Sequence, residues 1–189
     1  MDSAHEAKWI YEELGIDLSD LGCIMAGVEP PRLNLPEEWL YYAKDKQRFW
    51  IDGIVDHSHV TLRYGMLPGI TKKHVDTVLG GWSMDDIYIK ETLVFDSPYK
   101  DENYKCIVLV VESPALIDAN KRLGLLPNVA TFKNYTPHIT MAYLKEEFVA
   151  EGIDLIRKQI QNYKPRFLEI DYGDQIRWQR GDVRTVKMI

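Results

Sequence analysis

One six-residue pattern occurs twice in this chain of 189 residues. Residues 59–64 read HVTLRY and residues 138–143 read HITMAY, so both follow the order His, apolar, Thr, apolar, any residue, Tyr. Given the composition, the chance that two histidines would begin this pattern by accident is on the order of one in ten thousand. The repetition therefore predicts two related segments that carry the same chemistry.

Alternation along a β-strand explains the spacing within each copy. Residues i and i+2 of a strand project from the same face, so His59 and Thr61 point together, as do His138 and Thr140. The apolar residues between them face the opposite way and are expected in the core. On a straight strand Tyr64 and Tyr143 also point at that core. Arg63 would lie on the polar face with His59, where its positive charge is a candidate phosphate ligand.

Each copy thus presents one imidazole and one hydroxyl side by side. If the two strands meet about a pseudo-twofold axis, two imidazoles flank a central point. An imidazole titrates near neutral pH, so one can accept a proton while the other donates one. The two hydroxyls can bind an anion between them. This set suits in-line displacement at a phosphodiester without a metal.

The remaining chain predicts an α+β protein of one domain with two lobes, covering residues 1–189. Strands are expected at 22–28, 58–64, 87–95, 104–111, 136–143 and 167–172, with one or two more in 175–188. Helices are expected at 4–14, 71–79, 113–123 and 148–163. The aromatic-rich segment 29–56 predicts a packed excursion, either a lid or an insert that covers a core edge.

Composition excludes several classes of protein. The chain carries 23 basic and 29 acidic residues, for a net charge of -6. Binding of long duplex nucleic acid is usually driven by a basic surface, so it is not expected here. The apolar runs are far shorter than the roughly 20 residues of a membrane helix, and the N-terminal residues do not resemble a signal peptide. Cys23 and Cys106 lie in apolar stretches, which predicts buried free thiols and a cytoplasmic location.

Here the sequence resembles the 2H phosphoesterases, a family defined by two His-x-Thr motifs in a bilobal α+β fold with two antiparallel sheets. The resemblance covers most of the chain. It implies that His59 and His138 are the general acid and the general base, in an order that the sequence leaves open. It also implies that Thr61 and Thr140 bind phosphoryl oxygens, and that no metal cofactor is required. Family members act on cyclic phosphates or on 2′-5′ and 3′-5′ linkages of small nucleotides.

The amino-acid sequence around the motifs is most similar to phage-encoded members of the family, such as the anti-CBASS nucleases. These viral enzymes destroy cyclic di- and trinucleotide immune signals and so evade host anti-phage defence. The resemblance implies a small cyclic or linear oligonucleotide substrate and action in the host cytoplasm. It also makes Tyr11 and Trp178 candidates for stacking on the bases.

Three other readings stay open. His57 and His59 form a His-x-His pair, which is a common zinc-ligand pattern. The same cleft also suits a nucleotide-binding sponge that sequesters signals without cleaving them. A third reading is a phosphodiesterase acting on 2′,3′-cyclic phosphates or 2′-5′ linkages of RNA.

Overall fold

The computed structural model describes residues 21–44, 51–97, 99, 101–129, 134–174 and 186–188. Its strands are β1 (Gly22–Val28), β2 (His59–Met66), β3 (Tyr88–Asp96), β4 (Lys105–Glu112), β5 (His138–Leu144), β6 (Phe167–Asp174) and β7 (Val186–Met188). Its helices are the short 3-10 turns η2 (Glu37–Trp39) and η4 (Glu146–Phe148), and α2 (Lys72–Val78), α3 (Pro114–Leu123) and α4 (Val149–Gln159). The expected α+β class is confirmed.

The strands of the described residues form a seven-stranded sheet in the order β3-β4-β5-β2-β1-β6-β7. Every pairing is antiparallel. The first six strands are symmetric about the seam between β5 and β2, because β5 corresponds to β2, β4 to β1 and β3 to β6. The chain crosses twice between the halves of the sheet. β3 follows the first motif strand, β2, but pairs with β4 in the other half. β6 follows the second motif strand, β5, but pairs with β1 in the half that contains β2. The predicted pseudo-twofold is therefore present.

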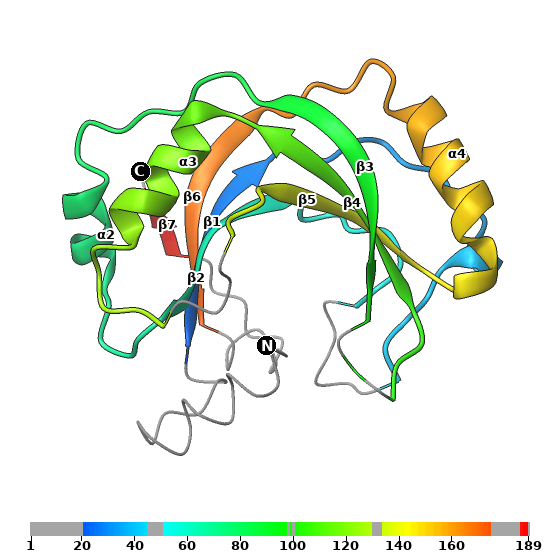
Figure 1. The fold of residues 1–189 in the computed structure, drawn as a ribbon, viewed down its shortest axis with the longest axis horizontal. Helices are drawn as coiled ribbons and strands as arrows, with labels where there is room; N and C mark the ends of the chain where they lie inside the picture. The colour runs from blue at the N-terminus through cyan, green and yellow to red at the C-terminus, as the bar shows by residue number, and fades with distance from the viewer. Residues whose placement is uncertain are drawn as a thin grey trace.

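The sheet is strongly arched, and its helices lie outside the arch (Figure 1). α2 and α3 cover the outer side of the half that contains β2, and α3 packs directly on that strand. α4 covers the outer side of the other half, where Gly152 lies against the Leu144 side chain of β5. The main core fills the space between sheet and helices. No helix in the described part of the chain is long and apolar enough to cross a membrane.

The two halves are joined at a narrow seam. β2 and β5 pair through Val60 and Ile139 and then diverge. The expected pair of antiparallel sheets is thus two three-stranded halves continued into one sheet. Beyond the seam, each motif strand forms an isolated β-bridge with a loop residue: Ala142 of β5 with Ile54, and Met66 of β2 with Asn128.

The described part of segment 29–56 packs along the sheet. Tyr41 donates its N–H to the carbonyl of Tyr143 at 2.9 Å, and Val55 donates to Met141 at 3.0 Å. Leu40 and Ile51 are buried. The described part of the segment therefore extends the edge of β5 that β2 leaves unpaired. The expected helix 4–14 lies outside the described residues.

Candidate active site

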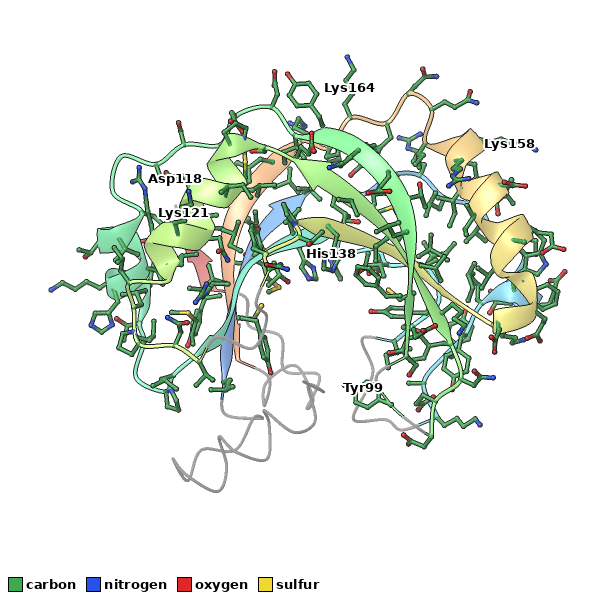
Figure 2. All side chains as sticks on the ribbon, viewed as in Figure 1. Tyr99, Asp118, Lys121, His138, Lys158 and Lys164 are labelled. Carbon is green, nitrogen blue, oxygen red and sulfur yellow. The ribbon has the colours of Figure 1, made fainter. Side chains whose placement is uncertain are left out.

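The seam places the two His-x-Thr pairs together. Val60 and Ile139 are opposite each other and fully buried. Counting one residue along each antiparallel strand sets Thr61 opposite His138, and Thr140 opposite His59. All four side chains then share the face opposite Val60 and Ile139. Figure 2 shows His138 on the concave side of the arch, so this is the face away from the helices.

Both histidines are held in the same way by the backbone. Nδ1 of His59 lies 3.2 Å from the carbonyl of His57, and Nδ1 of His138 lies 2.9 Å from the carbonyl of Thr136. A carbonyl only accepts, so each Nδ1 carries the proton and donates it. The tautomer is thereby fixed, and Nε2 is the nitrogen through which each ring can exchange a proton.

The surroundings of His59 favour one charge state of its ring. The pKa of His59 is lowered from its usual 6.5, chiefly because burial disfavours the imidazolium. The hydrogen bond to the His57 carbonyl opposes this effect, and the charge of His138 adds to it. The two imidazoles are thus close enough for the charge of one to affect the other. His59 is favoured in its neutral form, which is the form that accepts a proton.

An aromatic ring supports the second imidazole. Phe95 of β3 contacts His138 edge to face, with ring centroids 5.2 Å apart and an interplanar angle of 78°. Phe95 is opposite Cys106 of β4, and Cys106 is opposite Tyr143 of β5, so these side chains form one row across the concave face. The Phe95 ring restricts the orientation of His138 in addition to its hydrogen bond.

A β-bulge in each motif changes which residues share this face. On β2, Thr61 is opposite Met25 and Tyr64 is opposite Cys23, so the three steps from Thr61 to Tyr64 match two steps on β1. Thr140 and Tyr143 are related in the same way to Val108 and Cys106. The extra residue reverses the alternation beyond each threonine. Tyr64 and Tyr143 therefore lie on the histidine face and not in the main core. Tyr143 still packs against buried side chains there, in the smaller cluster formed by Tyr41, Ile51 and Tyr104.

The same bulge separates Arg63 from the histidines. Arg63 is opposite Ile24, a core residue. Its guanidinium binds Oδ1 of Asn128 through Nη2 at 2.6 Å and through Nε at 3.2 Å, and it lies beside Gly124 at the end of α3. The structure therefore places Arg63 toward the helical side, where it ties β2 to the loop that follows α3.

Tyr135, which has no marked place in the sequence pattern, links the two motifs. Its hydroxyl donates to the backbone carbonyl of Thr61 at 2.9 Å. Burial raises the pKa of this hydroxyl, so it stays protonated as a donor. The residue lies three positions before His138, and Thr136, which holds His138, follows it directly. The bond thus attaches the segment that precedes His138 to β2, the strand that carries His59. This link is visible only in the geometry of the seam.

Other expected site residues are not brought to this face. Tyr11 and Trp178 lie outside the described residues. The ring of His57 is 97% exposed and lies 3.7 Å from Asp56. No group of three or more His, Cys, Asp or Glu side chains within the described segments is arranged to hold a metal ion. His57 contributes its carbonyl, rather than its ring, to the arrangement around His59.

Comparisons with known proteins give structural likeness at low sequence identity. No family model matches the chain, and no curated protein matches it. A structure of Usb1 from Kluyveromyces marxianus aligns with a TM-score of 0.46 and 9% identity over 90% of this chain and 98% of that one. A structure of the same protein with uridine monophosphate gives a TM-score of 0.43 and 9% identity, over 90% and 99% of the two chains. The assignment of function therefore rests on the geometry of the site.

Proposed function

We propose that this protein is a metal-independent phosphodiesterase of the 2H type that cleaves small cyclic nucleotides or short oligonucleotides. The observation that carries the proposal is the symmetric pair of imidazoles at the seam, each with Nδ1 bound to the carbonyl two residues before it. Two rings with equivalent Nε2 atoms can serve opposite sides of one phosphorus. Thr61 and Thr140 supply hydroxyls for its non-bridging oxygens.

The first step is transfer within the substrate. Nε2 of His59 takes the proton of a ribose 2′-hydroxyl, whose oxygen then bonds to the adjacent phosphorus. The bond from phosphorus to the 5′-oxygen breaks, and Nε2 of His138 donates a proton to that oxygen. The products are a 2′,3′-cyclic phosphate and a free 5′-hydroxyl. His59 is the base in this scheme because its lowered pKa keeps it neutral.

The second step is hydrolysis of the cyclic phosphate with the two roles exchanged. His138 takes a proton from water, and the water oxygen bonds to phosphorus. The 2′-oxygen leaves with a proton from His59, which restores both rings and gives a 3′-phosphate. Microscopic reversibility favours this exchange, because the same two groups flank the phosphorus in both steps.

The proposed substrates are cyclic di- and trinucleotide immune signals, and the proposed role is viral evasion of host anti-phage defence. The resemblance of both motif segments to phage-encoded enzymes supports this choice. The net charge of -6 supports a small substrate over a long polyanion. Tyr11 and Trp178 remain proposed base-stacking residues, whereas Arg63 is left out of the phosphate site because Asn128 holds its guanidinium.

Two alternatives share the same face. A sponge would bind the signal at the same imidazoles and release it intact, and an RNA-end phosphodiesterase would open 2′,3′-cyclic phosphates or cleave 2′-5′ linkages. Purified protein is therefore incubated in EDTA with each nucleotide class, and products are read by chromatography and mass. Cleavage of cyclic di- or trinucleotides supports the proposal. Recovery of intact bound nucleotide supports the sponge, and cleavage of 2′-5′ or terminal cyclic phosphates alone supports the RNA enzyme.

A further inference from the structure

The two cysteines of the chain occupy equivalent positions in the two halves. Cys23 of β1 is opposite Tyr64, and Cys106 of β4 is opposite Tyr143. Each lies on the strand next to a motif strand, beside the bulge that follows the motif threonine. The chain has two cysteines in all, and both lie on the histidine face. Chance placement of small apolar residues does not predict this symmetry.

Each thiol contacts the threonine of its own half. Sγ of Cys23 lies 4.0 Å from Oγ1 of Thr61, at the long end of the range for a hydrogen bond that involves sulfur. The thiol of Cys106 interacts with the side chain of Thr140, which lowers the pKa of the thiol against the larger effect of burial. Cys23 is 8% exposed, and Cys106 is half-buried. Each thiol therefore lies next to the threonine of its own half, with a measured contact between Cys23 and Thr61.

The thiols are suited to act as donors. Burial raises the pKa of each thiol to about 12, so both carry their hydrogen at neutral pH. A threonine oxygen that accepts this hydrogen still has its own hydrogen to donate. That hydrogen is then directed away from the sulfur, toward an acceptor on the concave face.

We propose that Cys23 and Cys106 are positioning residues that orient the hydroxyls of Thr61 and Thr140 toward the phosphoryl oxygens of the substrate. The inference rests on the proposed function, because the hydroxyls have this task only if a phosphate lies between the imidazoles. It assigns the thiols no contact with substrate. Each thiol restricts the rotation of the neighbouring threonine hydroxyl, so that less rotational freedom is lost when the anion binds.

Alanine and serine variants at each cysteine test the inference. Ala removes the donor, whereas Ser keeps one in a similar position. We expect Cys106→Ala and Cys23→Ala to lower kcat/KM three- to tenfold, and Cys106→Ser and Cys23→Ser to stay within about twofold of the wild type. A cysteine that only fills apolar space predicts the opposite order, because Ser buries a polar group there. Circular dichroism melting of each variant reports whether the fold is kept.

A double-mutant cycle shows whether the thiol acts through the threonine. In a Thr61→Val background, Cys23→Ala should produce no further loss, since there is no hydroxyl left to orient. The matched cycle pairs Thr140→Val with Cys106→Ala. Equal losses in both backgrounds would overturn the inference, as would Ala variants that match the wild type. Valine at each cysteine repeats the donor deletion where an Ala variant fails to fold.

Binding of inorganic phosphate separates this inference from the proposed function. Titration of the wild type and the four single variants, followed by ³¹P NMR, does not depend on turnover. A wild type that binds phosphate without cleaving any nucleotide would contradict the proposed enzyme but leave the thiol effect measurable as a weaker phosphate affinity of the Ala variants. A wild type that neither binds phosphate nor cleaves nucleotides would overturn both.

Discussion

Val60 of β2 and Ile139 of β5 face each other at the centre of the approximate twofold axis, and both side chains are completely buried. Each precedes a motif threonine and follows a motif histidine in the chain. Burial of this pair anchors the backbone on either side of it, so the two imidazoles cannot move independently of the core. The position of the proposed catalytic groups therefore depends on the packing of the residues beneath them.

Replacing either imidazole should lower turnover severely. We expect His59→Gln and His138→Gln each to lower kcat by about 10²- to 10⁴-fold, because each removes one proton-transfer group. Melting temperatures should stay close to the wild type, since both side chains are only partly buried and lie outside the main core. His57→Ala is the matched control, as its ring is exposed and its backbone carbonyl remains. Loss of activity in that control would favour the zinc-ligand reading of the His-x-His pair.

Tyr135→Phe tests the link between the motifs. It removes the hydroxyl that binds the Thr61 carbonyl, which should cost about 1 kcal/mol of stability. We expect a fall in kcat of about tenfold with little change in KM, because the bond positions the imidazoles relative to each other. Tyr163→Phe is the control: its hydroxyl binds the carbonyl of Glu29 at 2.6 Å, away from the histidine face. Equal kinetic effects of the two variants would contradict a positioning role.

The pH dependence follows from the lowered pKa of His59. The base must be neutral, so on the acid side kcat/KM should fall as the pH drops below 6.5, through this lowered pKa. The unfolded chain takes up a proton on this residue first, so the free energy of unfolding should decline over the same acidic range, and His59→Gln should reduce that decline. The proton NMR titration of the His59 ring checks this directly. In the His138→Gln variant the pKa of His59 should rise toward 6.5, because the positive charge of His138 is removed. A pKa at or above 6.5 in the wild type would contradict the assignment of His59 as base.

Gly65 tests the loop that packs on the end of β2. Its φ is +90°, and an added Cβ would lie 2.2 Å from the carbonyl oxygen of Val129. The N–H of Val129 donates to the carbonyl of Gly65 at 2.8 Å, so the two backbones are held close together. We expect Gly65→Ala to lower the free energy of unfolding by about 2–4 kcal/mol. Gly69 has a similar φ of +94° with open space around it, so Gly69→Ala should cost only about 1–2 kcal/mol. Urea denaturation of both variants distinguishes steric contact from backbone strain.

Much of this arrangement is predictable from the sequence. The alternation of polar and apolar residues within each motif places His59 with Thr61 and buries Val60, and the structure has both. The repeated pattern predicts the twofold relation, because two copies of one strand that bury the same face pack most simply about a common axis. The crossovers that exchange β3 and β6 between the halves carry no signal in the motifs themselves.

The strands depart from regular alternation at points that the sequence does not mark. A bulge after each threonine turns Tyr64 onto the histidine face and Arg63 away from it, and nothing in the residue types marks the extra residue. The partner of Tyr135 was equally hidden, since a carbonyl on another strand has no sequence signature. The cysteines were expected to be buried thiols, and they are free thiols, with Cys23 buried and Cys106 half-buried. Their contact with the threonines depends on the register between β1 and β2, and between β4 and β5.

The central claim is that two imidazoles carry out phosphodiester cleavage without a metal. The most direct measurement is turnover of a panel of cyclic di- and trinucleotides by wild type, His59→Gln and His138→Gln in EDTA, with products identified by mass. The account predicts cleavage by the wild type through a 2′,3′-cyclic phosphate, and cleavage at least about 10²-fold slower by either variant. Cleavage that EDTA abolishes, or that stays near the wild-type rate in either folded variant, would contradict it.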